Sequence, residues 1–108
     1  MGISLEEIVT ELVVNGGDAK SKAIQAIRAA KIGDFNTAEQ RIQECNESLN
    51  KAHKFQTEII QAETRGENKA EISLLMVHGQ DHLMNAITTK DLALEMIDMY
   101  KIIFKKND

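Results

Sequence analysis

The sequence predicts an all-α fold, a three-helix up-down-up antiparallel bundle in a single domain (1–108). The chain has 108 residues, no proline and only 4% aromatic residues, which fits long helices better than a sheet. Apolar residues recur every three or four positions over long segments, as on one face of a helix. Turn signals at 33–34 and 65–68 divide these segments into three. Long amphipathic helices joined by short links form antiparallel bundles.

The first helix is predicted over about 4–32. Its start is marked by Ser4-Leu5-Glu6-Glu7, a capping box that satisfies free amides at a helix N-terminus. The segment Asn15-Gly16-Gly17-Asp18 interrupts it and, taken alone, could be a turn between two shorter helices. The apolar spacing keeps its phase across this segment up to Gly33. This favours one continuous helix with a weak or kinked point.

The second helix is predicted over about 34–65. Gly33 is expected to end the first helix and Asp34 to cap the second. The single cysteine, Cys45, excludes an internal disulfide, suits a reducing cytosol and is predicted to be a small core residue. It belongs to a regular seam, typical of a helical bundle, formed by Phe35, Ala38, Ile42, Cys45, Leu49, Ala52, Gln56 and Ile59.

The third helix, predicted over about 69–104, carries a group of polar residues on one face. We call His78, Asp81, His82 and Asn85 the polar inlay, because their spacing places them together on a helix. Buried polar groups are costly unless they are paired, so the inlay is predicted to be a functional site. Mostly apolar residues continue this face, which is therefore expected to pack inward. Besides Thr89 they are Leu74, Leu75, Leu92, Ala93, Met96 and Met99.

A second apolar stripe runs along the same helix. A helix that is apolar on two sides usually meets two neighbours, and one of them is predicted to come from another copy of the chain. This second stripe consists of Leu83, Ala86, Ile87, Leu94 and Ile97.

Charge and hydropathy exclude several kinds of partner. The net charge is −4, and no basic stripe is present, so nucleic acid is not expected as a partner. No apolar run is long enough to span a bilayer, and the N-terminus lacks the cationic start of a signal peptide. We therefore expect a cytoplasmic protein with no direct membrane insertion.

The residues around His78 suggest two kinds of chemistry. A lone histidine is most often a core residue, but a neighbouring carboxylate or imidazole, here Asp81 and His82, fixes its tautomer and raises its basicity. His78 is then a candidate nucleophile or metal ligand. If the helix lies on an oligomer axis, the Asp81 carboxylates converge and need a proton or a cation. A zinc enzyme is weakly supported, because no glutamate lies between the two histidines.

The segment Val77-His78-Gly79-Gln80-Asp81-His82-Leu83-Met84 resembles the signature of the lactose/cellobiose class of enzyme IIA. These are components of the phosphoenolpyruvate-dependent sugar phosphotransferase system. The resemblance spans nearly the whole chain, and its departures are small: Gly79 stands where many members have alanine, and Lys20 where arginine is commoner. Further segments resemble family blocks in the family order: Asn15 to Ser21, Gly33-Asp34-Phe35, Ala52-His53 with Gln56-Thr57, and Lys90-Asp91-Leu92.

The resemblance implies a role for several residues. His78 would accept a phosphoryl group on Nε2 (the tele nitrogen) from the phosphorylated histidine phosphocarrier protein and pass it to a cysteine of the cognate IIB component. Asp81 would meet its two symmetry mates on the axis of a homotrimer and share one Mg²⁺, and the second apolar stripe would fit the trimer interface. Gln80 and His82 would support the phosphorylated ring. The protein would thus serve the uptake of a β-linked disaccharide.

Two alternatives remain open on the sequence. A histidine phosphotransfer module of two-component signalling is also a helical bundle of this size with one reactive histidine, but it predicts a monomer. A helical interaction protein would use the polar inlay only to fix the register of its helices. The sugar is undetermined, and lactose, cellobiose and chitobiose are all compatible with the sequence.

Overall fold

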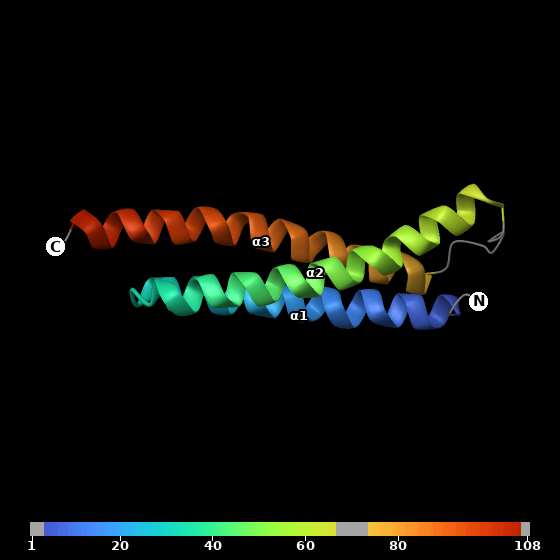
Figure 1. Ribbon diagram of the computed structural model, residues 1–108, viewed down its shortest axis with the longest axis horizontal. Helices are drawn as coiled ribbons and strands as arrows, with labels where there is room; N and C mark the ends of the chain where they lie inside the picture. Colours follow the sequence, from blue (N-terminus) through green and yellow to red (C-terminus); the bar gives the residue numbers. More distant parts are fainter. Residues whose placement is uncertain (1–3, 67–73, 107–108) are drawn as a thin grey trace.

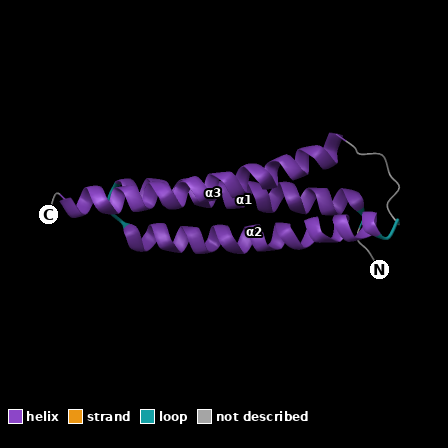
Figure 2. Cartoon of the chain, turned by 90° about the horizontal axis from the view of Figure 1, so that it is seen from above, coloured by secondary structure: helices purple, strands orange, loops and turns teal. Residues whose placement is uncertain are grey.

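Three long helices make up the computed structural model, which describes residues 4–66 and 74–106. In chain order they are α1 (Leu5–Lys31), α2 (Phe35–Thr64) and α3 (Leu74–Lys106). They lie side by side, each antiparallel to the one before it, in a bundle with extents of 59 × 21 × 19 Å (Figure 1). The described residues contain no strand, as Figure 2 also shows, so the predicted all-α, up-down-up fold is confirmed.

The helix ends follow local capping chemistry. Ser4 caps the N-terminus of α1, where its Oγ accepts a hydrogen bond from the amide of Glu7 at 3.1 Å. Gly33 lies just beyond α1 with φ 81°, a left-handed conformation that glycine adopts without strain. Asp34 then caps α2 by accepting from the amide of Thr37 at 3.2 Å. Hydrogen bonds from the side chain and amide of Thr37 lower the pKa of Asp34 below its ordinary value.

The predicted helix bounds lie close to the observed ones where the two can be compared. Gly66, with φ 72°, lies in the turn that follows α2. The predicted start of the third helix, at 69, lies outside the described residues, as do Glu67 and Asn68 of the turn signal. The C-terminus of α3 reaches Lys106, slightly past the predicted end, and extends beyond the turn between α1 and α2 (Figure 1).

The glycine-containing segment of α1 does not interrupt the helix, because α1 runs continuously from Leu5 to Lys31. The prediction of one continuous helix is therefore confirmed. Gly16 is buried against α3, where the missing side chain lets the two helices approach closely. The weak point in the sequence is thus a place of close helix packing.

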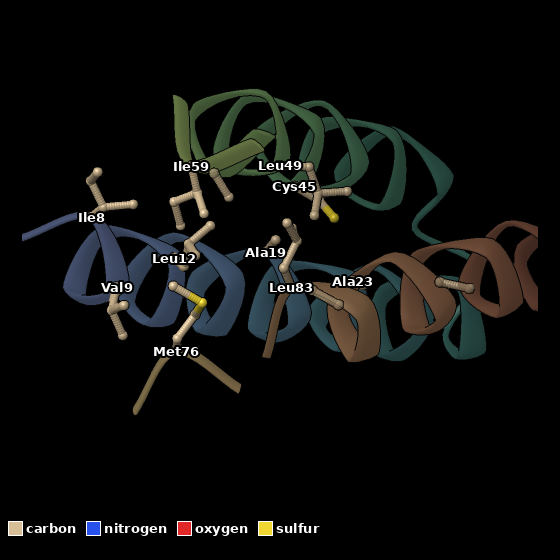
Figure 3. Packing of buried hydrophobic residues seen from close by; sticks show 13 residues of the cluster. Ile8, Val9, Leu12, Ala19, Ala23, Cys45, Leu49, Ile59, Met76 and Leu83 are labelled. Carbon is tan, nitrogen blue, oxygen red and sulfur yellow. The ribbon is translucent and has the colours of Figure 1, made fainter. Parts of the chain in front are cut away.

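The core lies between the three helices and contains mostly aliphatic and small side chains. Figure 3 shows Leu12 of α1, Ile59 of α2 and Met76 of α3 among the clustered side chains. Cys45 is fully buried in the predicted seam of α2, and burial raises the pKa of its thiol above the ordinary value. The thiol therefore stays protonated at neutral pH and packs as a small apolar group, as the sequence predicts.

The direction in which α3 faces differs from the sequence prediction. The polar inlay does not pack inward: His78, Asp81 and Asn85 are exposed, and His82 is half-buried. Most of the apolar residues that continue this face are also exposed, with exposed fractions of 86% for Leu74 and 53% for Leu92, whereas Ala93 is buried. The prediction that this stripe is the inner one is therefore wrong.

The second apolar stripe is the one that packs within the chain. Leu83, Ala86 and Ile97 are buried, although Leu94 is exposed, and α3 contacts α1 much more extensively than it contacts α2. The sequence assigns this stripe to a contact between copies of the chain, and that assignment is wrong. The reason is that α3 carries two apolar stripes of similar hydropathy, so the spacing of its apolar residues does not show which stripe is buried.

We call the exposed side of α3 its outer face. Asp81 lies within this face, surrounded by exposed apolar side chains along the helix. None of the helices in the described part of the chain is long and apolar enough to cross a membrane. The apolar members of the outer face are Leu74, Val77, Met84, Leu92, Met99, Ile102 and Ile103.

Candidate functional site

His78 and His82 form a contact on the surface of α3, and we call them the histidine pair. They lie one helical turn apart, so their side chains are neighbours. The two Nε2 atoms are 3.1 Å apart, and the rings meet edge to face with centroids 4.5 Å apart and an interplanar angle of 79°. A hydrogen bond between two Nε2 atoms requires one of them to carry a proton and the other to offer a lone pair.

This contact defines what each ring can do. When His82 donates from Nε2, the Nε2 of His78 is unprotonated and its proton is on Nδ1. Such a neutral imidazole is a nucleophile through Nε2. The hydrogen bond occupies the lone pair, so the two rings must separate slightly before His78 can attack another atom. Because His78 is exposed, a second protein can reach its ring directly.

Asp81 lies beside the histidine pair on the outer face of α3. It lines a shallow hollow together with His78 and the apolar residues Leu74, Leu75 and Val77. No group of three or more histidine, cysteine or acidic side chains among the described residues could hold a metal ion within one chain. A metal ion at Asp81 would therefore need carboxylates from other copies.

Gln80 lies on a different side of α3 from His78. Residues two apart on a helix do not face each other. The side chain of Gln80 is half-buried and its Oε1 accepts a hydrogen bond from Nε2 of Gln56, on α2, at 2.8 Å. Within one chain the structure thus brings His82, but not Gln80, to the ring of His78.

Gln56 is the residue whose role the sequence does not reveal. Its spacing places it in the apolar seam of α2, between Ala52 and Ile59, where a polar side chain is unexpected. That mismatch is the signal that could have identified it, because a half-buried amide requires a hydrogen-bond partner. His53, three residues earlier, is exposed on α2.

The ion pairs of the described chain do not involve the histidine pair. Arg41 and Lys22 contact Glu44 at 2.6 and 4.0 Å, and Lys101 contacts Glu39 at 3.5 Å. The recorded polar contact of Nε2 of His78 is with Nε2 of His82, 3.1 Å away. An exposed imidazole with a second imidazole beside it could act as a nucleophile.

Comparison with known protein families identifies the chain. Residues 7–101 match the family described as "PTS system, Lactose/Cellobiose specific IIA subunit". The lichenan-specific phosphotransferase enzyme IIA component of Bacillus subtilis is 50% identical over 103 residues, which cover 95% of this chain and 93% of that protein. The N,N'-diacetylchitobiose-specific EIIA component of Escherichia coli is 40% identical over 97 residues, covering 90% and 83% respectively.

Solved structures agree with these relatives. The crystal structure of the cellobiose-specific enzyme IIA from Bacillus anthracis is 49% identical, with a TM-score of 0.92 over 98% of this chain and 96% of that one. A IIA(chitobiose) chain solved in complex with HPr is 36% identical, with a TM-score of 0.81 over 94% and 98%. The chain belongs to the lactose/cellobiose-specific IIA family, the phosphotransfer components of the sugar phosphotransferase system.

Proposed function

We propose that this protein is a cytoplasmic phosphocarrier that accepts a phosphoryl group on Nε2 of His78. The donor is the phosphorylated histidine phosphocarrier protein HPr, and the acceptor is the cysteine of a cognate IIB component. The observation that carries the proposal is the exposed side chain of His78, whose Nε2 lies 3.1 Å from Nε2 of His82. A relative of the same fold that was solved in complex with HPr supports the choice of donor.

The first transfer begins when the ring of His78 separates from that of His82. The lone pair on Nε2 of His78 forms a bond to phosphorus, and the phosphorus–nitrogen bond to the HPr histidine breaks. The electron pair of that bond returns to the HPr ring, so no other reactant is needed. Phosphoryl transfer depends mostly on positioning and on stabilisation of the charged oxygens. A helix holds the backbone of His78 rigidly, which supplies the positioning.

His82 has a second use once His78 is phosphorylated. Its Nε2–H no longer has the His78 lone pair as acceptor, but a phosphoryl oxygen now occupies the adjacent space. Hydrogen bonds to charged acceptors are stronger than those between neutral groups. His82 therefore holds the phosphorylated ring in place between the two transfers.

The second transfer reverses the bonding at His78. The thiolate of the IIB cysteine attacks phosphorus, the bond to Nε2 of His78 breaks, and the lone pair returns to that nitrogen. His82 can then donate to it again. Because His78 is exposed, the same ring is accessible to both partners in turn. This is how the chain would serve the uptake of a β-linked disaccharide, whose identity its relatives do not decide.

We further propose that three copies pack through the outer face of α3. This face exposes many apolar side chains in one chain, and such a patch is typical of a protein–protein interface. Asp81 lies within the face and makes no ion pair with any described residue. Three Asp81 carboxylates on an axis would repel, and Mg²⁺ prefers carboxylate oxygens, so these residues fit one shared ion.

The ion is tested by its effect on the stability of the assembly. After treatment with EDTA, added Mg²⁺ is expected to raise the Tm of the wild-type protein, because an ion that binds only the folded assembly stabilises it. Asp81→Asn removes the charge and is expected to leave a Tm that does not respond to Mg²⁺. An equal Tm increase in both proteins would mean that Mg²⁺ does not bind at Asp81.

The relay itself is tested with purified components. The wild-type protein is incubated with phosphoenolpyruvate, enzyme I and HPr, and its intact mass is measured. We expect a gain of one phosphoryl group that is lost in acid, as for a phosphohistidine, and that is lost again when IIB is added. No gain with a donor shown to be active would refute the proposal. Phosphorylation only by an aspartate-bearing receiver would favour two-component signalling.

A further inference from the structure

The backbones of α1 and α3 approach each other closely behind the histidine pair. A Cβ atom on Gly16 of α1 would lie 3.2 Å from both the carbonyl carbon and oxygen of His82, and 3.3 Å from the amide nitrogen of Leu83. These three atoms belong to one peptide group of α3. The absence of a side chain at Gly16 is therefore what lets α1 lie against this peptide.

The neighbouring glycine has no such contact. A Cβ atom on Gly17 would meet nothing within 4 Å. Glycine weakens the interior of a helix relative to alanine. At Gly17 no close contact compensates for this cost. At Gly16 the atoms in the way are backbone, which cannot move aside by changing rotamer. The two adjacent glycines thus differ in whether the structure requires them.

A second contact holds α3 one turn earlier. Gly79 packs on α1, where an added Cβ would lie 3.2 Å from Cγ1 of Val9 and 3.4 Å from Cβ of Leu12. Val9 and Leu12 are almost fully buried, so this contact is firm. The residues from Gly79 to Leu83 are therefore held against α1 at both ends. The two imidazole rings that meet through Nε2 are attached within or directly beside this turn.

We propose that Gly16 is a positioning residue for the histidine pair. Its missing side chain lets α1 hold the peptide between His82 and Leu83, and so keeps Nε2 of His82 within hydrogen-bond distance of Nε2 of His78. At 3.1 Å the contact is near the long end of the range for such bonds. A methyl group at Gly16 pushes one end of the turn while Val9 and Leu12 hold the other, and this bends α3 where both rings are attached.

The test compares Gly16→Ala with Gly17→Ala. The readout is the ¹⁵N NMR signature of the imidazole nitrogens, which distinguishes a protonated from an unprotonated Nε2. In the wild type and in Gly17→Ala we expect one ring of each tautomer. In Gly16→Ala we expect the rings to show the mixed tautomers of unconstrained histidine. Phosphoryl acceptance from HPr is expected to fall about tenfold, as for the loss of one hydrogen bond.

A further variant separates positioning from a general loss of stability. Ala26 is fully buried in α1 and packs in a different cluster, so Ala26→Gly weakens the same helix away from the histidine pair. It is expected to lower the Tm and to keep the wild-type tautomer signature. The proposal is overturned if Gly16→Ala keeps that signature, or if Ala26→Gly loses it to the same extent.

If Gly16→Ala does not fold, Val9→Ala loosens the second α1–α3 contact, at Gly79, without adding volume. An unchanged signature in that variant overturns the proposal that packing of this turn on α1 holds the histidine pair. The inference about transfer rate rests on the proposed relay, whereas the NMR signature does not. A wild type that accepts no phosphoryl group but loses its signature on Gly16→Ala would refute the relay and retain the positioning role.

Discussion

His78→Ala is expected to reduce phosphorylation by HPr to below detection. The alanine side chain has no lone pair that could attack phosphorus, and no second group replaces it at the exposed position on α3. His82 lies one turn away and is half-buried, so it is not expected to substitute for His78. Intact mass after incubation with phosphoenolpyruvate, enzyme I and HPr measures the result.

His53→Ala is the matched control for this experiment. His53 is an exposed histidine on α2, and its backbone oxygen, which accepts from Thr57, is retained in the alanine variant. The control is expected to gain the phosphoryl group at the wild-type rate. If His78→Ala also gained it at that rate, the acceptor would be a different residue, and the assignment of His78 would be wrong.

Leu92→Glu is expected to convert a trimer into monomers. Leu92 lies on the outer face of α3 and is 53% exposed in the single chain. Three copies that pack through this face would bury three carboxylates close together among apolar side chains, which is unfavourable both by desolvation and by repulsion. Sedimentation equilibrium over a range of protein concentrations measures the assembly state.

Ile60→Glu provides a control of nearly equal exposure on another helix. Ile60 is 54% exposed on α2, away from the outer face of α3. A glutamate there remains in contact with water, so the variant is expected to keep the assembly of the wild type. A wild-type protein that sediments as a monomer, or a Leu92→Glu variant that remains a trimer, would contradict packing through the outer face.

Most of the fold could be predicted from local sequence chemistry. Gly33 and Asp34 mark a helix boundary because their conformational and capping preferences act within a few residues. The seam of α2 is predictable for a similar reason, since its other side is polar and only one face can be buried. Helix existence and approximate bounds depend on such local properties, and the structure agrees with them.

The orientation of α3 could not be predicted in the same way. Its two apolar stripes are similar in hydropathy, and which one faces α1 depends on the shape of the partner helix. The small residues Gly79, Ala86 and Ala93 mark the inner stripe, because they allow the backbones to approach. Size, rather than hydropathy, would have been the better guide. The pairing of Gln80 with Gln56 depends on the same long-range arrangement.

The exposed ring of His78, at the edge of a shallow hollow on α3, has a consequence for its partners. A single ring on one turn of a helix can be covered by one protein at a time. HPr and IIB would therefore have to exclude each other, even if their folds are unrelated. Each would need a surface that fits the same turn from His78 to His82, so a change in the shape of this turn would alter both exchanges at once.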